Sequence, residues 1–173
     1  MTAHPTALGG RPINGTISRR GPGAQRPIEE LIAAIDAVFA FPEVQKVKWH
    51  QYTPGWNDGE PCEFSADEPS FLIEGVIPTV EPDDYFDEDD EDDDSIRFVS
   101  AWDIKYGNVL GPEKYGEPVK YPHLSAELVT AIDALETAIT STGHQTALQT
   151  HFGDPSEITA TRDGFNVAAS DFY

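Results

Sequence analysis

The chain has 173 residues, with 11 Lys and Arg against 31 Asp and Glu, so its formal net charge is −20 at pH 7. This length suits one domain with a substantial core, and 39% hydrophobic residues supply it. The single cysteine excludes an internal disulfide framework and a zinc site built on cysteines. No apolar run reaches the length of a membrane helix and no hydrophobic signal segment follows the N-terminus, so we expect a cytoplasmic protein.

The charge is distributed unevenly along the chain. Residues 81–94 contain 11 acids in 14 positions and no base, and such self-repulsion predicts a solvated acidic loop. Residues 1–26 carry four arginines, no acid and many Gly and Pro residues, which predicts a disordered or loosely packed N-terminal arm. The remainder, residues 27–173, is expected to form a single domain that includes the acidic loop. This pattern argues against direct nucleic-acid binding.

A helix is predicted from Pro27 to about Ala40, followed by a strand from Val47 to Thr53. In the first segment apolar residues recur at helical spacing, and a proline suits the first turn of a helix. In the second segment the side chains alternate between two faces. One face holds Val47, Trp49 and Gln51, and the other holds Lys48, His50 and Tyr52.

Residues 54–59, Pro-Gly-Trp-Asn-Asp-Gly, are typical of a turn, and the Asn-Asp-Gly part tolerates positive φ angles. A second strand is predicted around Pro61 to Ala66 and a third over residues 71–77, so the three strands are expected to form an antiparallel meander. After the acidic loop, alternation from Ser95 to Trp102 predicts a fourth strand. Residues 103–122 are rich in Gly, Pro and Tyr and predict a long loop.

Two further helices and a hairpin complete the prediction. An apolar stripe predicts a helix from Ser125 to Thr140, with Ser125 as its N-cap and Gly143 at its end, and a shorter helix follows over residues 145–151. Near the C-terminus, Asp163-Gly164 separates two alternating runs, which is a strong signal for a β-hairpin. Strands and helices segregated in this way predict an α+β fold, in which a mostly antiparallel sheet carries two main helices on one face.

The segments Trp49 to Phe64 and Thr161 to Phe165 carry the motifs W-x-Q-Y-T-P-x-x-N-D-G-x-P-C-x-F and T-R-D-G. These motifs resemble those of a family of small uncharacterised proteins, encoded mostly by bacteriophages and by some bacteria. The resemblance covers the central block and the C-terminal hairpin, with His50 and Gly55-Trp56 at variable positions. It implies a phage or bacterial cytoplasmic origin and no particular chemistry.

Four residues of the central block are candidates for catalysis, because an imidazole, a thiol and carboxylates supply acid–base and nucleophilic groups. They are His50, Asp58, Glu60 and Cys62. Their spacing matches no known catalytic pattern, so structural roles in the turn, the core and the strand surface are favoured. His144 and His151 are two helical turns apart, too far to bind one metal ion, and are expected on a solvated helix edge. We therefore expect no metal and no cofactor.

Aromatic residues beside acids are typical of a protein-binding surface. The residues predicted to form it are Tyr52, Trp56, Asn57, Asp58, Tyr85, Phe86, Asp87, Asp89, Asp90 and Asp92. We therefore expect a non-enzymatic phage or bacterial accessory protein that binds a protein with a basic surface, for example as a DNA-mimic-like inhibitor of a basic host protein. Two alternatives stay open, a small-ligand or nucleotide-handling protein or enzyme with a site at the 50–62 turn, and a minor virion component. The acidic loop could also serve solubility alone.

Overall fold

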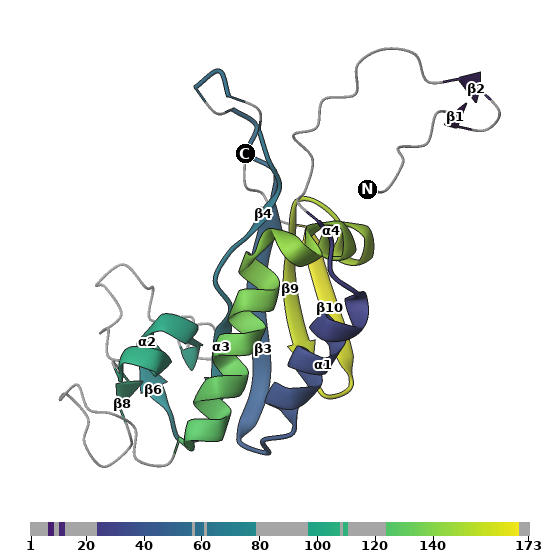
Figure 1. Ribbon diagram of the computed structural model, residues 1–173. Helices are drawn as coiled ribbons and strands as arrows, with labels where there is room; N and C mark the ends of the chain where they lie inside the picture. The colour runs from purple at the N-terminus through teal and green to yellow at the C-terminus, as the bar shows by residue number, and fades with distance from the viewer. Residues whose placement is uncertain are drawn as a thin grey trace.

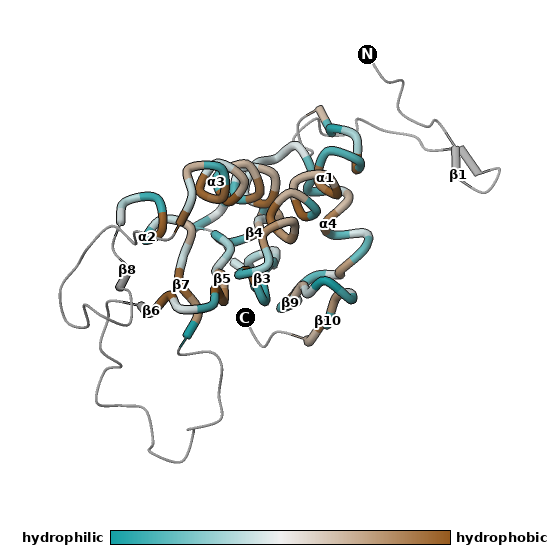
Figure 2. Tube along the Cα trace, turned by 90° about the horizontal axis from the view of Figure 1, so that it is seen from below, coloured by the Kyte–Doolittle hydropathy of each residue, from teal (hydrophilic) through white to brown (hydrophobic). Residues whose placement is uncertain are grey.

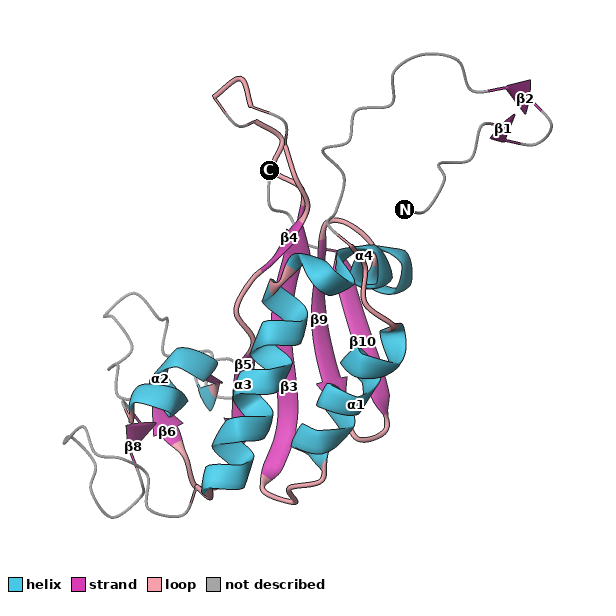
Figure 3. Ribbon diagram, viewed as in Figure 1, coloured by secondary structure: helices cyan, strands magenta, loops and turns pink. Residues whose placement is uncertain are grey.

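The computed structural model describes residues 7–8, 11–12, 24–56, 58–60, 62–78, 97–107, 109–110 and 124–169 (Figure 1). The predicted acidic loop, residues 81–94, and most of the predicted N-terminal arm lie outside these ranges. Within them the protein is a six-stranded antiparallel sheet with helices α1, α3 and α4 on one face, as the views in Figures 2 and 3 show. The predicted α+β fold is therefore confirmed.

The central strand of the sheet is β3, Val44–Tyr52. The strand order is β10-β9-β3-β5-β7, and β4 pairs with the C-terminal end of β3. The flanking strands are β4 (Ser65–Ala66), β5 (Ser70–Ile73), β7 (Val99–Ser100), β9 (Ser156–Thr161) and β10 (Gly164–Ala169). All of these pairs are antiparallel, as expected of a meander joined to a C-terminal hairpin.

Strand β3 alternates as predicted, although it begins three residues earlier. Val47, Trp49 and Gln51 are buried on the face covered by the helices. Lys48 and His50 are half-buried on the opposite face, which we call the open face of the sheet. A strand in the middle of a sheet with one covered face needs this period of two, so the burial follows directly from the residue pattern.

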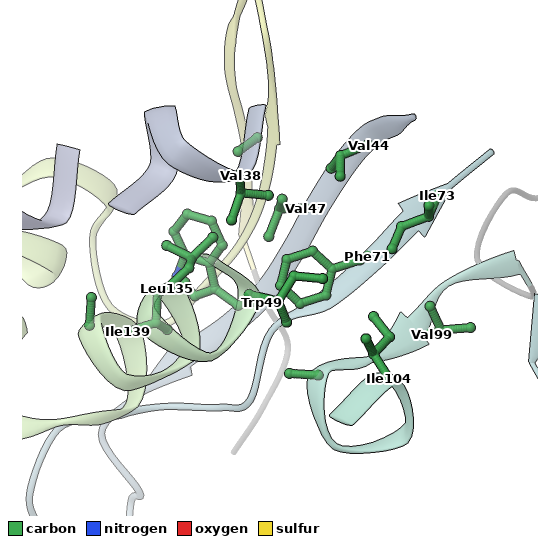
Figure 4. Packing of buried hydrophobic residues seen from close by; sticks show 14 of the residues in the cluster. Val38, Val44, Val47, Trp49, Phe71, Ile73, Val99, Ile104, Leu135 and Ile139 are labelled. Atoms are coloured by element: carbon green, nitrogen blue, oxygen red, sulfur yellow. The ribbon is translucent and has the colours of Figure 1, made fainter. Parts of the chain in front are cut away.

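The hydrophobic core lies between the sheet and the two long helices, as Figure 4 shows. Trp49 and Phe71 enter it from adjacent strands, and Leu135 and Ile139 enter it from α3. The Trp49 ring also meets the ring of Phe152 edge-on, with 5.6 Å between centroids and an angle of 83°. Burial of each of these large side chains contributes roughly 1.5–3 kcal/mol, so the core dominates the stability of the fold.

Helix α1 spans Ile28–Phe39, close to its predicted bounds. Pro27 precedes the helix, and Glu29 and Glu30 lie in its first turn, where negative charge interacts favourably with the helix dipole. The predicted apolar face is only partly covered, because the Ile32 side chain keeps 48% of its surface exposed.

Helix α3 spans Ala126–Thr140, and the Ser125 hydroxyl accepts a hydrogen bond of 3.1 Å from the amide of Leu128, which confirms the predicted N-cap. The helix ends before the predicted Gly143. That glycine lies inside a 3-10 turn, η3 (Thr142–His144), which leads directly into α4, Gln145–Phe152. The backbone of Arg26 donates to the Gly143 carbonyl at 2.7 Å, so residues just before α1 hold this turn against the body.

The predicted second and third strands are shorter than expected. Of the described residues in the predicted 61–66 strand, Ser65 and Ala66 alone pair with β3, because the chain before them belongs to a projecting loop. The third strand ends at Ile73, where Gly75 adopts a φ of 76° and redirects the chain. Strand β6 (Ile77–Pro78) then pairs with β8 (Val109–Leu110) in a separate small sheet, and β1 (Ala7–Leu8) pairs with β2 (Arg11–Pro12) in another.

The prediction of a strand from Ser95 to Trp102 is wrong at Ala101 and Trp102. Of the described residues in this range, Val99–Ser100 is a strand, and Ala101–Tyr106 form helix α2, so the predicted loop over 103–122 is also wrong at its start. The cause is an N-cap: the Ser100 hydroxyl accepts from the Asp103 amide at 3.0 Å. Gly107, with a φ of 75°, then ends the helix.

The C-terminal hairpin is confirmed. Thr161 and Gly164 form its closing pair, and Arg162 and Asp163 make the turn between β9 and β10. The turn is also anchored to the body, because the Arg162 guanidinium donates to the Phe41 carbonyl at 2.7 Å.

Candidate functional site

The chain between β3 and β4, residues 53–64, projects beyond the ends of the neighbouring strands (Figure 3). We call it the β3–β4 loop. At its first residue, Thr53 donates two hydrogen bonds to the Asp154 carboxylate, one from its amide at 2.7 Å and one from its hydroxyl at 2.6 Å. The Gln149 side chain donates to the same carboxylate at 2.9 Å. One stem of the loop is therefore fastened to the segment that joins α4 to β9.

The other stem of the β3–β4 loop is fastened to the start of α4. The Gln145 side-chain amide donates to the Phe64 carbonyl at 2.7 Å. Just beyond the loop, the Asp67 amide donates to the His50 carbonyl at 2.8 Å. The two stems thus contact residues 101 and 81 positions away in sequence, which holds the base of the loop in place while its tip projects.

Gln51 provides a buried polar anchor beneath the same stems. Its side-chain amide donates to the carbonyls of Leu148 at 3.1 Å and Gly153 at 2.6 Å, and its oxygen accepts from the Trp49 indole at 3.3 Å. These bonds join the middle strand to two backbone carbonyls at the end of α4, and the Gly153 carbonyl also accepts from the Ser156 hydroxyl at 3.4 Å. Alternation along the strand predicted that Gln51 shares a face with Val47 and Trp49, but no sequence pattern indicated these hydrogen bonds.

The tip of the β3–β4 loop contains a tight turn with Asp58 at a φ of 40° and Gly59 at 89°. These positive angles agree with the predicted turn chemistry. Trp56 lies just before this turn with 75% of its surface exposed. Asp58, Glu60 and Glu63 are exposed on the same loop, and the sequence contains no Lys or Arg between residues 49 and 96. The described part of the loop therefore combines a large exposed aromatic ring with negative charge.

The residues predicted to bind a partner have different positions in the structure. Tyr52 is half-buried at the end of β3, and Trp56 and Asp58 are exposed at the loop tip. The predicted contacts at Asn57, Tyr85, Phe86, Asp87, Asp89, Asp90 and Asp92 lie outside the described residues.

The four catalytic candidates are divided between two surfaces. Asp58 and Glu60 are exposed in the β3–β4 loop, and Cys62 is a half-buried free thiol there. His50 lies on the open face of the sheet, where its Nε2 is 2.6 Å from a carboxylate oxygen of Glu157. The ammonium of Lys48 is 3.3 Å from the same oxygen. Sequence spacing could not reveal this group, since His50 and Glu157 are 107 positions apart and meet only through strand pairing.

His144 corrects a prediction. Instead of lying on a solvated helix edge, it is 1% exposed, and its Nδ1 is 3.1 Å from the Ala138 carbonyl. The 3-10 turn between α3 and α4 turns this side chain inward, whereas His151 is exposed on α4. In the ranges that the structure describes, no three His, Cys, Asp or Glu side chains are grouped so as to bind a metal ion.

Comparison with protein-family models, with curated proteins and with solved structures found no match for this chain. Within its described residues, none of the helices combines the length and the apolar composition needed to cross a lipid bilayer.

Proposed function

We propose that this protein is a non-enzymatic accessory protein of phage or bacterial origin that acts by binding a protein with a basic surface. The β3–β4 loop is the contact surface. The observation that carries this proposal is the position of Trp56, which is 75% exposed in a projecting loop whose charged residues are all acidic.

The physical basis is the combination of an anchored base with an exposed aromatic tip. Large exposed aromatic side chains at the centre of an interface commonly supply most of its binding energy. A Trp ring also attracts Arg and Lys side chains through its π face, and the nearby carboxylates of Asp58 and Glu60 would neutralise the same cations. Because Thr53 and Phe64 are hydrogen-bonded to the body, less conformational entropy is lost when the loop binds.

The acidic segment, residues 81–94, would extend the same electrostatic character. A run of carboxylates can take the place of nucleic-acid phosphates on a basic protein and accelerate association at low salt. The protein would then act as a DNA-mimic-like inhibitor, while its own net charge of −20 disfavours direct contact with nucleic acid.

The test is capture of partners from bacterial lysate on the immobilised protein at low and high salt, with mass spectrometry of the bound fraction. Trp56→Ala should lose the captured basic partner, because removal of such an anchor typically costs about 2 kcal/mol or more, roughly a 30-fold loss of affinity. Trp102→Ala is the matched control, since Trp102 is also an exposed tryptophan but lies on α2 against Tyr106, with 4.7 Å between ring centroids. Deletion of residues 81–94 should weaken capture and flatten its salt dependence.

Capture that is unchanged in Trp56→Ala would refute the proposal for the β3–β4 loop. Capture that is equally strong at high salt would refute its electrostatic part.

A further inference from the structure

Strand β10, Gly164–Ala169, forms one edge of the sheet. Among the described residues it pairs only with β9, and all six of its residues are exposed. Its sequence, Gly-Phe-Asn-Val-Ala-Ala, contains no charged residue and no proline, and its pairing with β9 runs without a register shift. Natural edge strands usually carry a charge, a proline or a bulge, because an exposed row of N–H and C=O groups otherwise recruits another strand.

The face of β10 that lies on the helix side is also incompletely covered. Phe165 and Val167, which pair with Ala160 and Ile158, are 47% and 49% exposed. Between α1 and the hairpin turn lies an open cavity of about 390 Å³, whose lining combines Ile35, Phe39 and Phe165 with the polar residues Asp36, Arg162 and Asp163. Phe165 and Val167 therefore form an exposed apolar pair on β10 that a neighbouring strand with its own apolar side chains would bury.

From these observations we propose that β10 pairs antiparallel with β10 of a second copy of this chain, which joins the two sheets across a twofold axis. An antiparallel pair of identical strands satisfies such an axis, because each residue then meets its partner reciprocally. With the axis at Val167, Val167 faces Val167 of the second copy and Phe165 faces Ala169. The ring of Phe165 in one copy thus meets the small side chain of Ala169 in the other. The strand is therefore complementary to itself, and it also lacks the features that keep edge strands from pairing.

The charge distribution agrees with this pairing. The acidic segment 81–94 joins the chain between β6 and β7, and β7 is the edge of the sheet opposite β10. At the β10 edge, the hairpin turn carries one base, Arg162, and one acid, Asp163. The main source of repulsion between two copies is therefore attached at the far edge of each sheet, and its remaining effect would be screened by salt.

The test is sedimentation of the full chain over a range of concentrations and salt. Association to twice the mass of one chain is expected, and it should strengthen as salt rises. Val167→Lys and Val167→Glu should each raise the dissociation constant more than about tenfold, because like charges would face each other across the axis and two valines would lose their burial. Since Val167 is half-exposed in the single chain, both variants should melt close to the wild type at concentrations too low for the wild type to associate.

A mixture of the Lys and Glu variants in equal amounts should recover the dimer, because opposite charges then face each other. A wild-type chain that stays monomeric at every concentration would overturn the proposal. So would a dimer that either variant leaves intact, or a mixture that stays monomeric although both variants are folded. The result is independent of the proposed function, because capture through Trp56 weakens with salt and should survive in Val167→Lys.

Discussion

Thr53 and Asp154 are 101 positions apart in sequence, yet the carboxylate of Asp154 accepts hydrogen bonds from both the amide and the hydroxyl of Thr53. Asp154 thus joins the segment between α4 and β9 to the first residue of the β3–β4 loop. Hydrogen bonds to a carboxylate are stronger than neutral ones, and this carboxylate also accepts from Gln149. The position of the loop is therefore determined by Asp154 as much as by the turn residues at its tip.

Substitution of Asp154 by Ala should lower the free energy of unfolding by about 1–2 kcal/mol, because three donors lose their acceptor but remain accessible to water. Acrylamide quenching of the Trp56 fluorescence, obtained as the difference between the wild type and Trp56→Ala, should also change, because the stem of the β3–β4 loop loosens. Asp154→Asn should lose less, since one side-chain oxygen still accepts. If Asp154→Ala has wild-type stability and quenching, Asp154 does not anchor the loop.

Gln51 should be among the polar residues that matter most for stability. Gln51→Leu keeps a similar size but removes the side-chain partner of the Leu148 carbonyl and of the Trp49 indole N–H, and leaves the Gly153 carbonyl with the 3.4 Å bond from Ser156. We expect a loss of about 2–4 kcal/mol in urea unfolding, since each orphaned buried group costs on the order of 1–3 kcal/mol and the site can partly relax. Gln45→Leu is the control, because Gln45 lies on the same strand but is exposed, and it should change stability by less than about 0.5 kcal/mol.

Long periodic elements were predictable from the sequence because their causes are local. The stripe of Leu128, Ile132, Leu135 and Ile139 specifies the buried face of α3, and Ser125 specifies its start. The Asp163-Gly164 pair likewise located the β9–β10 hairpin. In each case the residues that determine the structure lie within a few positions of one another.

The predictions from sequence were wrong where a second local signal outweighed the first, or where a contact distant in sequence determines the structure. Alternation from Ile96 to Ala101 indicated a strand, but the cap formed by Ser100 and Asp103 starts α2 instead. His144 was predicted at the surface, but it is buried, and the turn that contains it is bonded to the distant Arg26 through the Gly143 carbonyl. Of the candidate site, the sequence predicted the exposed Trp56 and the Asp58-Gly59 turn. The anchors at Asp154 and Gln145 could not be found, because no local pattern marks contacts that span 101 and 81 positions.

The contact between α2 and α3 predicts a dependence on alkaline pH. Lys105 of α2 donates to Glu136 at 2.5 Å and to Asp133 at 3.1 Å, and these carboxylates, Glu136 first, raise the pKa of the Lys105 ammonium well above its ordinary 10.5. Because the native state holds this proton more tightly than the unfolded chain does, the stabilisation is complete below the ordinary pKa. It is lost as the pH rises through the higher native pKa.

Urea unfolding of the wild type and Lys105→Met should therefore differ by a constant amount between about pH 7 and 10, and the difference should shrink only at higher pH. A difference that already falls between pH 7 and 9 would show that Lys105 does not lie between these two carboxylates in solution.

The His50 and Glu157 pair on the open face should stabilise the sheet without contributing to partner binding. Both side chains are about a third exposed, so a double-mutant cycle with His50→Ala and Glu157→Ala should give a coupling free energy of about 0.5–1 kcal/mol near neutral pH. Lys48 lies near the same carboxylate, so Glu157→Ala alone should lower the free energy of unfolding more than His50→Ala alone.

Capture of the basic partner should be unchanged in His50→Ala, because this imidazole bonds across the sheet to β9 whereas Trp56 lies on the projecting loop. Loss of capture in a folded His50→Ala variant would show that the partner binds the open face of the sheet and not the β3–β4 loop.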